Sequence, residues 1–209
     1  FTTNGDALAN GYNNDHPVNS IGVGHPPKVA TDPVGPAVVA LIDLRRTAKL
    51  EDGLVVVEAS IPSATSPMLP ALFTAGGPLI GRNSDTGDQL DELGRAVQSL
   101  IHGAYQGAVR NTQTFLAVGH DAGTGRMRLE NDRLVIQWPG AAQDPIFQRI
   151  EETFMRAVAA TGGTYMKNPL SLRMLGGNLL TVHPLGGCTM GADRTSGVVN
   201  HKGQVFSGA

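Results

Sequence analysis

The chain has 209 residues, a formal net charge of −2 and 16% charged side chains. This length can bury one substantial core, and the charge balance excludes the strongly basic surface that attracts nucleic acids or anionic lipids. No apolar run approaches the roughly 18 residues of a membrane-spanning helix. Cys188 is the single cysteine, which excludes a disulfide within the chain and leaves the cellular compartment open.

The first third of the chain predicts a long loop followed by two strands. Residues 10–36 are crowded with Asn, Pro and Gly, which is typical of a loop. Residues 37–44 (AVVALIDL) and 54–61 (LVVVEASI) are apolar runs rich in Val, and each predicts a strand. Side chains alternate between the faces of a strand, so Glu58 shares a face with Val56.

Glu58 is thus a carboxylate in line with apolar neighbours. Burial among them would suit a general base, because a desolvated carboxylate binds a proton more readily. A glutamate at a solvated strand end is the alternative that the pattern leaves open.

Three helices are predicted in the middle of the chain. Residues 66–75 form a short one, with Ser66 as the N-cap and Pro67 at its first position. Residues 88–105 and 145–160 form two longer ones, the second capped by Asp144. Their apolar stripes consist of Leu90, Leu93, Val97, Leu100, Ile101 and Ala104 in the first, and of Ile146, Ile150, Phe154 and Val158 in the second.

The remaining elements are short strands. Residues 112–119 predict one strand, and 126–130 with 133–138 predict a hairpin. Residues 164–166 predict a short strand and 197–206 a second hairpin. Together the elements predict an α+β fold, with an antiparallel or mixed sheet of about five to six strands and the two long helices packed on one face.

The stretch 181–191 (TVHPLGGCTMG) carries the strongest signal of chemistry. Pro184 biases His183 towards an extended backbone. Gly186 and Gly187 allow the main chain to turn, or to approach a group that a Cβ would exclude. A histidine on a stiff segment beside such an approach is typical of a catalytic group. A histidine that merely satisfies a turn is the alternative.

This stretch resembles the His-Pro-Leu-Gly-Gly-Cys-x-Met-Gly signature of the GMC (glucose-methanol-choline) flavoprotein oxidoreductases, and of their cholesterol oxidase branch in particular. The resemblance implies that His183 is catalytic and lies beside the flavin ring of FAD, with Gly186 and Gly187 among the cofactor-binding residues. Asn4 and Gly5 resemble the segment by which the family's chain leaves its flavin domain, which makes them cofactor-binding candidates too.

Glu58 falls where cholesterol oxidases carry the glutamate that acts as a base on the steroid, so the resemblance implies a second catalytic residue there. The implied reaction is oxidation of the CH–OH group of an alcohol, with a 3-hydroxysterol favoured, to a ketone and with double-bond isomerisation as an optional second step. A GMC dehydrogenase for a non-steroid alcohol and a non-catalytic domain that binds an apolar ligand are the alternatives. No spacing of His and Cys predicts a metal site.

Several features predict that the chain is part of a longer protein. It begins at Phe1 and contains neither a dinucleotide-binding glycine fingerprint nor the Asn-Pro segment of the GMC family. We expect residues 1–175 to be the substrate (steroid)-binding domain and residues 176–209 to be part of the FAD-binding domain. The expected partners are a small apolar alcohol and the missing FAD-binding portion, without nucleic acid.

Overall fold

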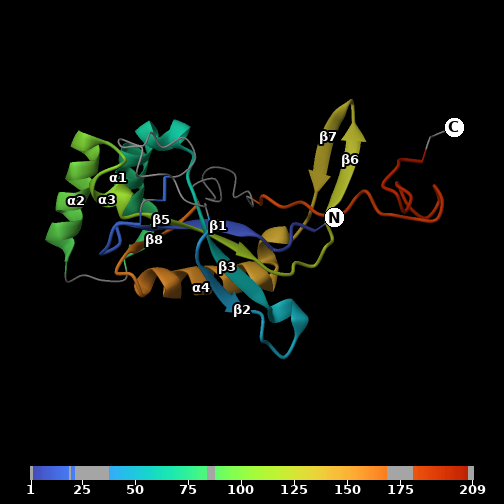
Figure 1. The fold of residues 1–209 in the computed structure, drawn as a ribbon, viewed down its shortest axis with the longest axis horizontal. Coiled ribbons are helices and arrows are strands. Elements are labelled where there is room, and N and C mark those ends of the chain that lie inside the picture. The colour runs from blue at the N-terminus through green and yellow to red at the C-terminus, as the bar shows by residue number, and fades with distance from the viewer. Residues whose placement is uncertain (1, 19, 22–37, 84–87, 169–180, 207–209) are drawn as a thin grey trace.

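The computed structural model describes residues 2–18, 20–21, 38–83, 88–168 and 181–206. Its centre is a six-stranded sheet in which every neighbouring pair of strands is antiparallel (Figure 1). In spatial order the strands are β2 (Leu41–Leu44), β3 (Leu54–Ala59), β5 (Gln113–Val118), β1 (Ala7–Tyr12), β8 (Thr164–Lys167) and β4 (Gly81–Asn83). The α+β class and the strand number are therefore confirmed.

The helices and a separate hairpin surround this sheet. The α-helices are α1 (Leu69–Ile80), α2 (Gln89–His102), α3 (Gly107–Arg110) and α4 (Pro145–Ala159). Short 3-10 helices span Leu50–Asp52, Ser63–Met68 and Ala141–Gln143. The predicted hairpin forms as β6 (Arg126–Glu130) and β7 (Arg133–Gln137) and stands away from the main sheet (Figure 1). Asn131 and Asp132 both have positive φ at its turn, as a tight hairpin connection requires.

Helix α4 covers one face of the sheet and confirms its predicted stripe. The carboxylate of Asp144 accepts the N–H of Ile146 at 3.2 Å, which satisfies one of the donors left free at a helix start. The side chains of the stripe are buried against β1, β3 and β5, and the rings of Phe115 and Phe154 lie 6.0 Å apart. This core consists of Ala9, Leu54, Val56, Phe115, Ala117, Ile146, Ile150, Phe154, Val158 and Tyr165.

The other face of the sheet carries a second core, which corrects the expectation that both long helices share a face. Consecutive residues of β8 point to opposite faces, and Tyr165 belongs to the α4 core whereas Met166 belongs to the second. Helices α1, α2 and α3 pack on the Met166 side. This second core consists of Tyr12, Ile21, Leu69, Phe73, Ala96, Ala104, Ala108, Val109 and Met166.

Strand β1 begins at Ala7 and extends to Tyr12, so its second half occupies the start of what the sequence predicted to be a loop beginning at residue 10. It is an inner strand of the sheet, paired with β5 and β8. Asn10 and Gly11, which disfavour strands by themselves, have structural roles there. The Asn10 side chain accepts the Thr114 hydroxyl at 2.9 Å, and a Cβ on Gly11 would stand 3.0 Å from a methyl group of Val158. Residues 22–36 of the predicted loop, and Ala37 of the predicted strand, lie outside the described residues.

Two helices differ from their prediction in detail. Helix α2 forms, but the predicted stripe residues within it face outward: Leu90 is 85% and Ile101 70% exposed, while Ala96 and Ser99 are buried. The last residue of the stripe, Ala104, lies beyond the helix end and is buried. Helix α1 begins at Leu69, after a 3-10 turn that contains the predicted start at Ser66. Among the described residues, no helix combines the length and apolarity needed to span a membrane.

Candidate functional site around His183

The C-terminal segment that carries His183 lies beside the start of the chain. The N–H of Thr2 donates to the carbonyl of Leu185 at 2.9 Å, and the N–H of Leu185 donates back to Thr2 at 2.7 Å. The two segments thus form a short antiparallel bridge. This bridge brings His183 to Asp6, a residue 177 positions away in the sequence.

Asp6 is a buried carboxylate on which three nitrogen atoms of the histidine segment converge. It is 0% exposed, and its Oδ2 accepts the backbone N–H groups of Val182 at 2.7 Å and of His183 at 3.0 Å. Nδ1 of the His183 ring lies 3.0 Å from the same oxygen. The buried Oδ1 of Asp6 has no hydrogen-bond partner among the described residues. Sequence reasoning missed Asp6, because nothing in the sequence pairs it with the histidine.

One edge of the His183 ring contacts Asp6, and the side chain is otherwise partly exposed. Its side chain is 49% exposed, and its Nδ1 edge faces the buried Asp6 carboxylate, so Nε2 is the nitrogen left for an outside group. Pro184 follows directly, and the segment forms no helix. An imidazole fixed in this way can accept or orient a proton of a bound hydroxyl.

The two glycines after His183 leave room for a ligand. Gly186 and Gly187 have φ values of +95° and +93°, which disfavour any residue with a Cβ. A Cβ built on Gly187 would meet no atom within 4 Å. The exposed pair next to a half-exposed imidazole therefore fits the approach of a flat ring such as that of FAD.

Asn4 and Gly5, the other cofactor-binding candidates, adjoin Asp6 at a turn where both have positive φ. The structure gives Gly5 a role inside the chain. A Cβ on Gly5 would stand 3.2 Å from Ile146 and 3.3 Å from the backbone nitrogen of Asp121. Gly5 is therefore required by packing, and contact of these two residues with a cofactor stays a prediction.

Asp121 fixes the turn that presents Asp6. Its Oδ2 accepts the N–H groups of Thr3 at 2.8 Å and Gly5 at 3.0 Å, and its Oδ1 accepts the N–H of Gly123 at 2.7 Å. Burial acts to raise the pKa of Asp121, but the side chain of Thr2 and these backbone donors outweigh it and lower the pKa to about 2. In the sequence Asp121 stands next to another titratable residue, His120, and such adjacency alone does not indicate a functional role.

Replacing Asp121 by Asn should loosen this turn in a pH-dependent way. Because the pKa of Asp121 is lower in the folded chain than its ordinary 3.8, its stabilisation is present above about pH 4 and is lost as the pH falls towards 2. Solvent screens this partly exposed group, so we expect Asp121→Asn to cost up to about 1 kcal/mol of unfolding free energy at pH 7. Urea unfolding of both forms between pH 2 and 7 measures this, and a difference that persists unchanged at pH 2 would contradict it.

Glu58 sits in a half-buried polar setting on β3. It shares the α4-covered face with Val56, which is 1% exposed. Its carboxylate accepts the N–H of Val39 and the side-chain amide of Gln113, both at 3.2 Å. The predicted alignment with apolar neighbours is therefore present, together with two hydrogen bonds that hold the carboxylate.

The structure does not bring Glu58 and His183 together. Ala7, the residue after Asp6, aligns through β5 with Val56, and Glu58 lies further along β3. Two strand spacings and about three residues separate Asp6 from Glu58, which puts their Cα atoms on the order of 10–15 Å apart. His183 contacts Asp6 and not the hydrogen-bond partners of Glu58, so the two residues implied as catalytic lie at different places in the structure.

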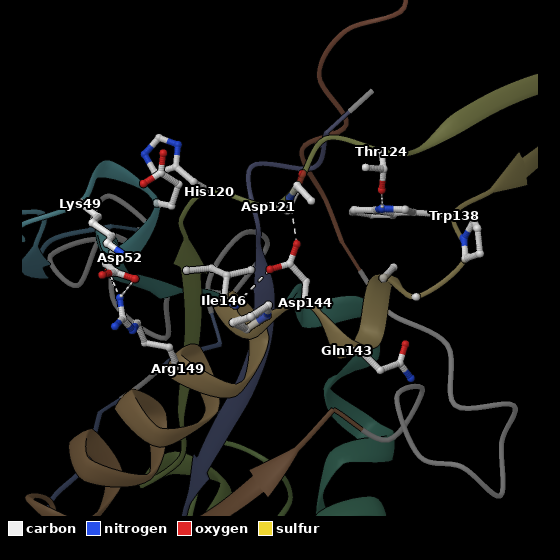
Figure 2. A pocket seen from close by; sticks show the side chains of 16 residues that line it. Lys49, Asp52, His120, Asp121, Thr124, Trp138, Gln143, Asp144, Ile146 and Arg149 are labelled. Carbon is white, nitrogen blue, oxygen red and sulfur yellow. Dashed lines mark hydrogen bonds and ion pairs between the residues drawn. The ribbon is translucent and has the colours of Figure 1, made fainter.

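A cavity of about 600 Å³, lined by both polar and apolar residues, opens near the start of α4 (Figure 2). Arg149 and Asp52 form an ion pair of 2.7 Å at one side, and the indole N–H of Trp138 donates to Thr124 at 3.1 Å at the other. Asp121 also lines this cavity, but neither His183 nor Glu58 does. Its walls carry charges of both signs, which do not single out one ligand chemistry.

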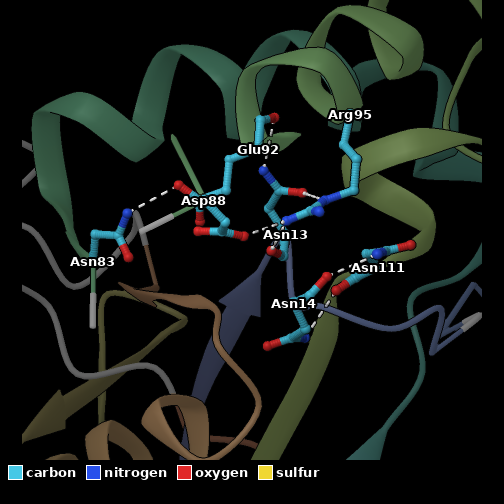
Figure 3. Close-up of polar contacts among 7 residues, drawn as sticks. All are labelled: Asn13, Asn14, Asn83, Asp88, Glu92, Arg95 and Asn111. Atoms are coloured by element: carbon cyan, nitrogen blue, oxygen red, sulfur yellow. Dashed lines mark hydrogen bonds and ion pairs between the residues drawn. The ribbon is translucent and has the colours of Figure 1, made fainter. Parts of the chain in front are cut away.

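A second polar cluster is structural (Figure 3). The guanidinium of Arg95 donates to the side chain of Asn13 at 2.7 Å and pairs with Asp88 at 3.2 Å. Asn14 and Asn111 exchange side chain-to-backbone hydrogen bonds of 2.8 and 2.7 Å. These contacts tie the end of β1 to α2 and to the start of β5, and they satisfy buried polar groups.

The described residues contain no group of three or more His, Cys, Asp or Glu side chains placed to hold a metal ion. The predicted domain boundary at residues 175 and 176, and Leu179 and Leu180 before the histidine motif, lie outside the described residues. Comparisons with family models, with curated proteins and with solved structures found no match to this chain.

Proposed function

We propose that this chain is the substrate-binding part of an FAD-dependent oxidoreductase that oxidises a secondary alcohol to a ketone, with His183 acting on the hydroxyl proton. The observation that carries the proposal is the placement of His183. One edge of its ring is held by the buried Asp6 carboxylate, and the other is free beside two exposed glycines. The motif's resemblance to the GMC flavoprotein signature supports the same reaction.

FAD, when bound, supplies the acceptor for the hydride that leaves the alcohol carbon. Gly186 and Gly187 are the residues that would lie against it, because their backbone is exposed and free of Cβ atoms. Nε2 of His183 takes or orients the hydroxyl proton, which an imidazole can do near neutral pH. The bridge between Thr2 and Leu185 ties the histidine segment to the start of the chain next to Asp6.

Anaerobic flavin reduction tests the proposal. The complete natural protein that contains this chain should be yellow, and a 3-hydroxysterol or another secondary alcohol should bleach its flavin absorbance and yield the ketone. A primary alcohol and the matching ketone serve as controls. Protein without flavin, or flavin that no alcohol in a panel of sterols and small secondary alcohols bleaches, would refute the proposal. An apolar ligand that binds without bleaching would point to the non-catalytic alternative.

The isomerisation step that the resemblance assigns to Glu58 is separable from oxidation. Because Glu58 lies away from His183, Glu58→Gln should oxidise a 3-hydroxysterol at nearly the wild-type rate and release the unshifted ketone. The amide still accepts a hydrogen bond from Gln113, so the fold should be retained. Chromatography of the two steroid ketones with each protein measures this. A shifted double bond in the Glu58→Gln product would remove Glu58 from the reaction.

A further inference from the structure

We propose that Asp6 is the positioning residue of His183. Its carboxylate holds the imidazole with the proton on Nδ1, so that Nε2 presents a lone pair to the alcohol hydroxyl. This inference rests on the function proposed above, which assigns the hydroxyl proton to His183 alone. It adds that Asp6 determines which ring nitrogen of that histidine carries the hydrogen and how the ring is oriented.

The donor set around Asp6 decides the tautomer. An ionised carboxylate can only accept hydrogen bonds, and Nδ1 of His183 lies 3.0 Å from Oδ2 of Asp6. Nδ1 must therefore carry a hydrogen. In a neutral imidazole the other nitrogen is then an acceptor, and an acceptor facing the substrate is what a general base needs.

The orientation of the ring is fixed by the same oxygen. Two backbone N–H groups, those of Val182 and His183, donate to Oδ2 of Asp6 at 2.7 and 3.0 Å. The backbone on which the ring is mounted and the ring itself are thus anchored to one buried atom. Rotation of the imidazole away from Asp6 would break only one of the three bonds, but it would leave a buried acceptor less satisfied.

The charge of Asp6 is not explained by these hydrogen bonds. An asparagine oxygen at the Oδ2 position would accept the same three donors, and its NH2 group would replace Oδ1. Oδ1 is buried without a hydrogen-bond partner among the described residues, which makes the carboxylate costly to bury. The negative charge becomes favourable when His183 takes a proton, because the imidazolium then forms a charge-assisted hydrogen bond to Asp6.

The proton and the hydride that leave the alcohol go to different acceptors. The hydroxyl proton would move to Nε2 of His183 as the C–O bond becomes C=O, and FAD, when bound, would supply the acceptor for the hydride that leaves the carbon with its electron pair. His183 then carries one positive charge next to the negative charge of Asp6. The pair is neutral overall in this state, so the buried carboxylate stabilises the product of the proton transfer.

Two variants of Asp6 distinguish its role in orienting the His183 ring from the role of its negative charge. In Asp6→Asn the two backbone donors should hold the amide oxygen at the Oδ2 position, so the Nδ1–H tautomer should persist while the charge is lost. In Asp6→Leu the acceptor is lost, and the preference for Nδ1–H should disappear. Asp91→Asn, an exposed aspartate on α2, is the matched control and should change nothing.

The tautomer is read by ¹⁵N NMR of histidine-labelled chain, which contains both cores. The kinetics are read in the complete protein. We expect wild type and Asp6→Asn to show Nδ1–H, and Asp6→Asn to lose about 10- to 100-fold in kcat with KM unchanged, as loss of part of a general-base contribution. We expect Asp6→Leu to lose more in kcat, approaching the value of a variant without the imidazole.

The outcomes separate this inference from the proposed function. A wild-type ring protonated on Nε2 alone overturns the positioning role, even if alcohol oxidation is found. Wild-type kcat in Asp6→Asn overturns the role of the charge. If no alcohol reduces the flavin of the wild type, the proposed function fails, and the NMR measurement still decides whether Asp6 sets the tautomer. If Asp6→Leu does not fold, Asp6→Asn still tests the charge, and the wild-type spectrum tests the tautomer.

Discussion

His183→Ala is expected to slow flavin reduction by the alcohol by roughly 10²- to 10⁴-fold, the usual contribution of a general base. Without the imidazole, the proposed acceptor of the hydroxyl proton is absent. The fold should be unaffected, because the side chain is half exposed and its removal leaves the backbone hydrogen bonds to Asp6 in place. Stopped-flow absorbance of the oxidised flavin, with substrate in excess and without oxygen, measures the rate.

The control is His201→Ala, an exposed histidine in the same C-terminal segment, which should reduce its flavin at the wild-type rate. Rates within a factor of two for His183→Ala and wild type would exclude proton acceptance by this residue. A loss that appears only in KM would assign His183 to substrate binding instead of to the chemical step.

The elements that local sequence determines were predictable. Helix α4 shows this most clearly, since Asp144 and Pro145 mark its start and the four apolar residues spaced at helical period all face the core. The β6–β7 hairpin was predictable for the same reason, because its turn residues stand directly between two alternating runs. In these segments capping, turn chemistry and periodicity all favour one structure.

Where tertiary contacts decide, the sequence was less informative. The period of α2 is correct, but its buried side is formed by Ala96 and Ser99, and the Ser99 hydroxyl accepts the N–H of Val109 at 2.9 Å. The helix backbones lie a short distance apart there, and only small side chains fit between them. The large apolar residues of α2 therefore indicated the wrong face of the helix as the buried one. Strand β1 was missed because it contains Gly11, which has a low strand propensity. Glycine is needed at this position because a Cβ would press against Val158 of α4.

Some residues of the candidate site could likewise be predicted from the sequence, and others could not. His183 and its glycines were recognisable, because proline and glycine constrain the backbone by themselves. Asp6 was not, because its role exists only after Thr2 pairs with Leu185. Glu58 was placed on the correct strand, but its distance from His183 depends on sheet register, which periodicity within one strand cannot supply.

Phe154→Ala should be the most destabilising of the variants considered, by about 3–5 kcal/mol of unfolding free energy. Phe154 is 2% exposed and lies between α4 and the sheet, where its ring meets that of Phe115. Removing it leaves a cavity between two rigid elements that cannot close without moving the helix. Urea denaturation followed by circular dichroism measures the change, with the m-value checking that the unfolding remains two-state.

Phe147→Ala is the matched control on the same helix. Phe147 is only partly buried against the α4 core, so water can fill part of the space left by its ring, and the loss should be less than half that of Phe154→Ala. Equal losses for the two variants would mean that α4 does not pack along the stripe of Ile146, Ile150, Phe154 and Val158. Because Gly5 also packs against Ile146, such a result would remove the support that holds the Asp6 turn, and with it the geometry assigned to His183.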